Sequence, residues 1–149
     1  ALGLDIDIVG PDASLDGYAL ILFPCLPIVG EALVARLEAT TCPIVIGPRS
    51  GSKTADFAIP ETLPPGPLAR LFPARVLHVE SLRPGLTHKG DGWAVAGWIE
   101  TVETGAQAEH VCNDGRVAVW RHGRVRYCAG LPDAVLAGRV IAGAAIEGG

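Results

Sequence analysis

Residues 17–51 read GYALILFPCLPIVGEALVARLEATTCPIVIGPRSG, and this stretch decides the fold class. Apolar runs of strand length flank a segment whose apolar residues recur at helical spacing. The pattern predicts a strand at Tyr18–Phe23, a helix at about Gly30–Ala39 and a buried strand at Ile44–Ile46. A tight loop, Gly47–Gly51, follows. A strand–helix–strand unit of this length predicts parallel strands, and hence an α/β fold with a mainly parallel sheet.

The rest of the chain predicts mostly strands. Alternating apolar and polar residues between turn signals predict strands at Leu4–Val9, Arg75–Glu80, Trp93–Ile99, Ala108–Cys112, Arg116–Arg121 and Arg124–Ala129. The last three should form an antiparallel meander, because Asn113-Asp114-Gly115 and His122-Gly123 are hairpin signals. Between the halves, Ser52–Pro73 is irregular and proline-rich, with one helical turn at Pro67–Phe72, and we interpret it as an interface or a lid. A final helix should open after Leu131-Pro132-Asp133.

Size and charge restrict the class of protein. The 149 residues, 49% hydrophobic and 19% charged, predict one globular domain over residues 1–149. The net charge of −4 argues against nucleic acid or an anionic membrane as partner. The densest basic cluster, Arg121, Arg124 and Arg126, is interpreted as a solvated strand edge. No apolar run reaches the roughly 18–20 residues that span a bilayer, and no signal peptide is visible, so the sequence predicts a cytoplasmic protein without a membrane segment.

The sequence predicts no metal site and no cofactor. The cysteines and histidines of the chain are Cys25, Cys42, Cys112, Cys128, His78, His88, His110 and His122. The cysteines form no C-x-x-C pair and the histidines complete no zinc spacing. All four cysteines lie in or beside apolar segments, and we expect buried free thiols.

Two motifs at or near the loop Gly47–Gly51 resemble functional sites, one for phosphate binding and one for a nucleophilic thiol, but each lacks a required part. Gly47–Thr54 matches a phosphate-binding loop except that Ser52 replaces the second glycine, and the proline-rich stretch allows no full helix after Thr54. We therefore interpret the motif as a turn in which Arg49 binds neighbouring carbonyl or carboxylate groups. Cys25 follows a strand, but an activated thiolate needs a helix N-terminus or a paired histidine, and neither is close in sequence.

Paired carboxylates offer a weaker signal. Asp5 and Asp7 share one face of a predicted strand, at a separation of about 6–7 Å, but such residues usually face solvent. Glu100 and Glu103, near Trp93 and Trp98, could line a surface that stacks on a sugar. Tryptophan in a core or a subunit interface is the commoner case, so we predict no catalytic residue in this chain.

Motifs in a fixed order run through the chain: Asp5-Ile6-Asp7-Ile8-Val9, Asp12-Ala13-Ser14-Leu15, Gly17-Tyr18-Ala19-Leu20-Ile21, Pro24, Glu31–Leu37, Gly47-Pro48-Arg49-Ser50-Gly51, Pro65-Gly66-Pro67-Leu68, Arg121–Tyr127 and the final helix. In order and spacing they resemble the middle domain of family 42 β-galactosidases. The resemblance covers essentially the whole chain.

The resemblance implies a fold and a role. The fold would be flavodoxin-like, a three-layer sandwich similar to class I glutamine amidotransferases, whose nucleophilic cysteine would lie at Gly47–Gly51; Pro48 and Arg49 stand there instead. The family's domain mediates trimer formation and helps to wall the active site of an adjacent subunit. The catalytic glutamates lie in a preceding TIM barrel, and no residue here corresponds to them.

The chain also departs from the family. The domain's first strand and helix are expected to be missing before Ala1, since Ala1-Leu2-Gly3 leads into a strand as a helix C-terminus does. Thr40-Thr41-Cys42-Pro43 stands where the family often has a Gly-Gly pair.

Three hypotheses follow. The leading one is a non-catalytic trimerisation domain of a bacterial β-galactosidase-like glycoside hydrolase, whose parent cleaves terminal β-galactosides. The alternative is a stand-alone module that binds a small ligand or carbohydrate through Gly47–Gly51 and Trp93 or Trp98. A thiol enzyme using Cys25 is the third.

Overall fold

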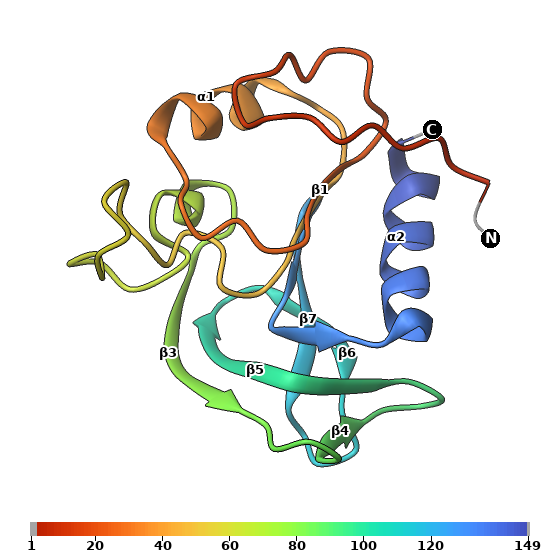
Figure 1. The fold of residues 1–149 in the computed structure, drawn as a ribbon. Helices are drawn as coiled ribbons and strands as arrows, with labels where there is room; N and C mark the ends of the chain where they lie inside the picture. Colours follow the sequence, from red (N-terminus) through yellow and green to blue (C-terminus); the bar gives the residue numbers. More distant parts are fainter. Residues whose placement is uncertain (1–2, 149) are drawn as a thin grey trace.

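A computed structural model of the chain describes residues 3–148 (Figure 1). Its larger sheet has the spatial order β1-β2-β8-β7-β6. These strands are β1 (Ile21–Phe23), β2 (Ile44–Ile46), β8 (Val125–Cys128), β7 (Val117–His122) and β6 (Gln107–Val111). β1, β2 and β8 are parallel, whereas β8, β7 and β6 form an antiparallel meander. The strand–helix–strand unit and the meander predicted from the sequence are both present.

Two helices cover opposite faces of this sheet, α1 (Glu31–Ala39) and α2 (Ala134–Gly148) (Figure 1). Because side chains alternate along a strand, β2 contributes to both sides. Ile44 and Ile46 belong to the core that contains the buried face of α1, and Val45 belongs to the core that contains the buried face of α2. The hydrophobic residues, 49% of the chain, thus supply two cores, one on each face of this sheet.

A second sheet makes the expected flavodoxin-like, mainly parallel sandwich wrong. β3 (Ala74–Ser81) and β4 (Thr87–Lys89) flank β5 (Ala94–Thr104), and β9 (Gly130–Pro132) also pairs with β5; all of these pairings are antiparallel. The molecule is therefore a mixed, mostly β structure with two helices. The long strand β5 folds beneath the first sheet instead of extending it (Figure 1).

The predicted strand at Leu4–Val9 is also wrong. Residues 3–10 carry no strand assignment, and the side chains of Ile6 and Ile8 are 81% and 98% exposed. A strand needs a hydrogen-bonded neighbour, and none of residues 3–148 supplies one. The other predicted strands occur with shifted ends: the one expected at Tyr18–Phe23 is β1, three residues long. Ala1 and Leu2, interpreted as a helix end, lie outside the described residues.

The proline-rich segment is irregular, as expected, with one short 3-10 helix, η1 (Gly66–Arg70). Pro67 lies at its start, where the missing N–H costs no hydrogen bond. Buried Leu68 and Phe72 anchor this end of the segment in the α1-side core. No helix within residues 3–148 is long and apolar enough to cross a membrane.

The basic cluster around the last hairpin does not form a solvated edge. Arg126 on β8 is 2% exposed, and its guanidinium donates to Glu109 on β6 and to Glu147 at the end of α2. Arg124 donates to the carbonyl oxygens of Leu37 and Cys42 at the end of α1. These arginines join both helices to the sheet, since a buried guanidinium must have its donors paired.

Replacing Arg126 should strongly destabilise the domain. Arg126→Met leaves the Glu109 carboxylate without its cation and Glu147 with Arg121 alone, and breaking such a buried pair costs about 3 kcal/mol. Urea denaturation followed by circular dichroism measures the loss. Arg83→Met, at an exposed turn position, is the matched control and should change stability little. Equal stability of the two variants would contradict the structural role of Arg126.

The same ion pair makes stability depend on pH. The hydrogen bond from Arg126 lowers the pKa of Glu147 below its ordinary 4.5. A depressed folded-state pKa adds stability above pH 4.5 that disappears as pH falls through the lowered value. Glu147→Gln should therefore be less stable at pH 7 and lose less stability on acidification than wild type. Urea melts between pH 7 and pH 3 test this, with exposed Glu61→Gln as control.

Candidate functional site

The loop Gly47–Gly51 leaves β2 at its carboxyl end, beside the carboxyl end of β1. Its backbone donors are already in use: the N–H groups of Gly47 and Gly51 donate to the carbonyl oxygens of Phe23 and Leu26, at N···O distances of 2.6 Å and 2.9 Å. Ser50, fully buried, donates its hydroxyl to the Gly47 carbonyl at 2.9 Å and accepts from the Leu26 N–H at 3.1 Å. The loop is therefore bound to the segment after β1 by a ladder of hydrogen bonds.

Gly47 is required at the start of the loop. A Cβ atom at this position would overlap the carbonyl oxygen of Pro24. The segments that follow β1 and β2 thus approach each other too closely to admit a side chain at position 47. The site that resembles a nucleophile position has no room for a nucleophile at its first residue.

The centre of the site is the buried carboxylate of Glu100, which is 5% exposed. Its Oε1 accepts the backbone N–H of Arg49 at 2.9 Å and the indole Nε1–H of Trp98 at 3.0 Å. Its Oε2 accepts the hydroxyl of Tyr127 at 2.6 Å. Three donors compensate for the loss of water around a buried charge. Glu100 thereby joins the loop, β5 and β8.

Tyr127 and Arg49 each make a second contact in addition to the one with Glu100. Burial, followed by the charge of Glu100, raises the pKa of Tyr127 well above its ordinary value, so the phenol stays protonated and donates. Its ring stacks on Phe72 with centroids 5.1 Å apart. Arg49 has a left-handed backbone, φ 65°, and its guanidinium lies 4.9 Å from the centroid of the Trp98 ring. The predicted interaction of Arg49 with a carboxylate is present, but through its backbone N–H.

The structure excludes the phosphate-loop interpretation of Gly47–Thr54. A phosphate loop leaves its amides free to surround the ligand. Here the amides of Arg49 and Lys53 donate to Glu100 and to the Pro27 carbonyl. The ammonium group of Lys53 lies over the ring of Phe57, and no helix follows Thr54 in the described chain. The turn interpretation is therefore correct.

The cysteines offer no activated thiol. Cys25 is exposed rather than buried, and within residues 3–148 no histidine hydrogen bonds to it. Cys112 and Cys128 are buried free thiols, as predicted, and burial raises the pKa of each, that of Cys128 to about 12. Cys42 is half-buried beside the hydroxyl of Thr40. No group of three or more histidine, cysteine or acidic residues in the described part of the chain has the geometry of a metal site.

The predicted carboxylate and tryptophan surface is only half present: Glu100 and Trp98 are hydrogen bonded to each other, whereas Trp93 and Glu103 lie elsewhere. Trp93 is buried in the α2-side core, where its ring meets His110 edge-on. Glu103 is exposed and pairs with Arg75, away from Glu100. Asp5 and Asp7 are exposed on the unpaired N-terminal segment, where Asp7 accepts the hydroxyl of Tyr18 at 3.1 Å.

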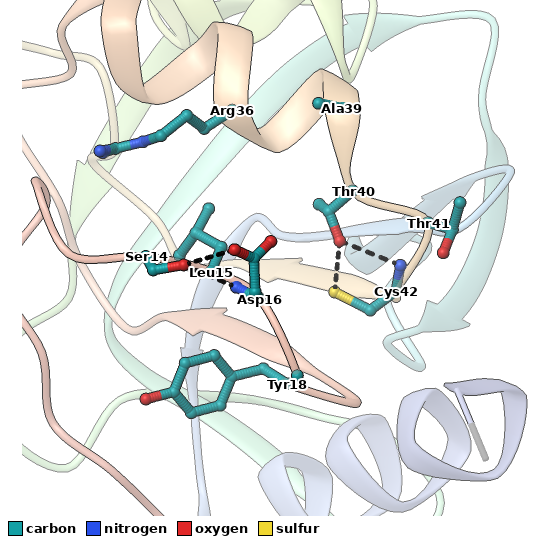
Figure 2. A pocket seen from close by; sticks show the side chains of 10 residues that line it. Ser14, Leu15, Asp16, Tyr18, Arg36, Ala39, Thr40, Thr41 and Cys42 are labelled. Atoms are coloured by element: carbon teal, nitrogen blue, oxygen red, sulfur yellow. Dashed lines mark hydrogen bonds between the residues drawn. The ribbon is translucent and has the colours of Figure 1, made fainter.

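One polar hollow of about 530 Å³ lies elsewhere, between the segment before β1 and the end of α1. Figure 2 shows Ser14 and Asp16 on one side and Thr40 and Cys42 on the other. These polar groups are satisfied within each side: Ser14 donates to Asp16 at 2.8 Å, and Thr40 lies 3.0 Å from the Cys42 sulfur. Arg36 also lines the hollow: its terminal nitrogens donate to the Asp12 and Pro11 carbonyl oxygens, and its buried Nε–H has no partner among the described residues.

Sequence reasoning missed the side-chain pairs that connect the sheets, which include the pair of Glu80 and Arg116 and the two pairs that follow. Glu100 and Tyr127 are 27 residues apart in the sequence, and no local sequence pattern predicts a contact between residues so far apart. His88 on β4 lies 2.6 Å from Asp114 at the tip of the β6–β7 hairpin. The hairpin itself was predictable, so its tip could have been examined for a charged partner.

Comparisons with known proteins agree with one another. The family model described as "Beta-galactosidase trimerisation domain" matches residues 1–147. The β-galactosidase of Thermus thermophilus is 45% identical over 99% of this chain, and BgaA of a Thermus species is 48% identical over 99%. Each match covers 24% of the relative, so the chain spans about a quarter of the length of these proteins.

Solved structures give the same result. The β-galactosidase of the psychrophilic Marinomonas ef1 has a TM-score of 0.92 at 31% identity, over 98% of this chain and 23% of that one. The enzyme of Halorubrum lacusprofundi has a TM-score of 0.83 at 32% identity, over 95% and 23%. The family match covers nearly every residue, and the chain belongs to the trimerisation-domain family of the family 42 β-galactosidases.

Proposed function

We propose that this chain is the non-catalytic, subunit-joining domain of a bacterial β-galactosidase-like glycoside hydrolase that assembles as a homotrimer. The observation that carries the proposal is the family match over residues 1–147. The loop geometry supports it, because the backbone donors of Arg49, Gly51 and Lys53 already bind protein acceptors. The parent enzyme would cleave terminal β-galactosides with residues outside this chain, in an upstream TIM barrel.

We further propose that the parent polypeptide completes the sheet with one strand and one helix before residue 1. Among the described residues, β1 pairs with β2 alone, so its outer edge is open. The extended segment 3–10 exposes the side chains of Ile6 and Ile8. Gly3 has φ 66°, the conformation common just after a helix end.

An apolar groove of about 200 Å³ supports the same proposal. It lies between the β1–β2 side of the sheet and α2, and it is lined by Leu22, Val45, Val140 and Ile141 among others. A helix packed beside α2 would cover this groove, and a strand between β1 and segment 3–10 would cover Ile6 and Ile8. The four free cysteines fit a reducing compartment, which supports a cytoplasmic location.

The assembly role is tested on the parent polypeptide. Sedimentation velocity at micromolar concentration should show a trimer, and deletion of residues 1–149 should give smaller species because the subunit contacts are removed. Galactosidase assays on the isolated chain should show no turnover. A parent that sediments as a monomer, or turnover by the isolated chain comparable to that of the parent, would contradict the proposal.

The completed sheet is tested at Ile8. The Ile8 side chain is 98% exposed in the isolated chain. Ile8→Asp should therefore change the free energy of unfolding of the isolated chain by less than about 0.5 kcal/mol. In the parent, a strand beside this segment buries the side chain, and the substitution should cost about 2 kcal/mol or more. Thermal and urea denaturation of the parent give the value, and Leu86→Asp, at an exposed turn position, is the control. A neutral Ile8→Asp in the parent overturns the missing-strand proposal and leaves the trimer proposal standing.

A further inference from the structure

The segment Arg49–Phe57 carries two cations over aromatic rings. Arg49 lies over Trp98 at 4.9 Å from the ring centroid, and Lys53 over Phe57 at 5.5 Å. The two cations are four residues apart, so both pairs of this type begin in one short segment. Asp56 is the single acid of the segment, which is therefore basic in a chain of net charge −4.

Phe57 is presented to solvent by a closed loop. The Phe57 N–H donates to the Thr54 carbonyl at 2.9 Å, and the Thr54 N–H donates to the Ala58 carbonyl at 3.0 Å. Phe57 is 63% exposed and has a left-handed backbone, φ 62°, which bulky side chains rarely adopt. Ile59, 83% exposed, follows it. The loop thus holds a large aromatic side chain outward in a conformation that the ring itself disfavours, and such outliers cluster at functional contacts.

The symmetry of a trimer indicates the partner. A closed ring of three identical subunits uses heterologous contacts, in which two different patches of the chain meet. The basic aromatic segment needs an acidic counterpart. Residues 3–18 carry Asp5, Asp7, Asp12 and Asp16, all exposed, and no lysine or arginine.

We propose that the loop 53–59 is a subunit contact: Phe57 docks against a second copy of this chain, and Lys53 faces its acidic segment 3–18. The inference rests on the proposed trimer and names the surface that forms it. The Thr54–Ala58 hydrogen bonds hold the loop in shape before assembly, which reduces the entropy lost on association. The apolar ring supplies affinity, and the charges select the orientation.

The test uses the full parent polypeptide and Phe57→Gly. Glycine suits the left-handed backbone, so this variant should fold at least as well as wild type while the aromatic anchor is lost. Removal of a central interface aromatic should weaken subunit association by about 30-fold or more, measured by sedimentation over a range of protein concentrations. Leu86→Gly, an exposed apolar residue in another turn, is the matched control and should leave association unchanged.

A charge reversal provides the second measurement. Lys53→Glu should weaken association and remove part of its salt dependence, and the added changes Asp12→Lys and Asp16→Lys should restore it. If wild type forms a trimer and both Phe57→Gly and Lys53→Glu associate as wild type does, the docking surface is elsewhere. If Lys53→Glu weakens association but the aspartate reversals restore none of it, the acidic partner is wrong. A monomeric wild type would instead contradict the proposed function itself.

Discussion

The buried carboxylate of Glu100 is the interaction on which the rest of the structure depends. It accepts donors from the loop after β2, from its own strand β5 and from β8. The loop after β2 and strand β8 belong to the first sheet, whereas β5 belongs to the second, so Glu100 joins the two sheets. A buried charge with three good donors is rigid, because any displacement leaves either the carboxylate or a donor unpaired. Together with the ion pair between Glu80 and Arg116 and the contact between His88 and Asp114, this residue fixes the relative position of the two sheets.

Local sequence patterns predicted the elements that depend on local physics. Residues 30–39 form a helix because their apolar side chains recur on one side, and residues 44–46 form a buried strand between turn signals. The hairpin at His122-Gly123 and the final helix follow from turn chemistry and from a helix start at Asp133, whose side chain caps the Leu136 N–H. These elements can be predicted without knowing which residues distant in the sequence will contact them.

The errors concern long-range partners. Leu4–Val9 has the alternation of a strand, yet a strand exists only with a paired neighbour, and the described chain offers none. The flavodoxin-like expectation failed because β3, β4, β5 and β9 pair with one another instead of extending the parallel set. Arg126 looked like a surface residue because charge patterns do not reveal burial; its two carboxylate partners lie 17 and 21 residues away. At the candidate site, the turn at Gly47–Gly51 was predictable from local sequence, whereas the role of Glu100 was not.

The hydrogen-bonded ladder between the Gly47–Gly51 loop and the segment after β1 has a mechanical consequence. Its amides and the Ser50 hydroxyl are fixed to one framework, and Gly47 touches Pro24 too closely for either chain to slide. The loop therefore cannot shift relative to the segment after β1 without breaking these hydrogen bonds, and a displacement of β2 would carry both segments together. A substitution that moves β2 in the core would then displace the Arg49 side chain at the protein surface as well.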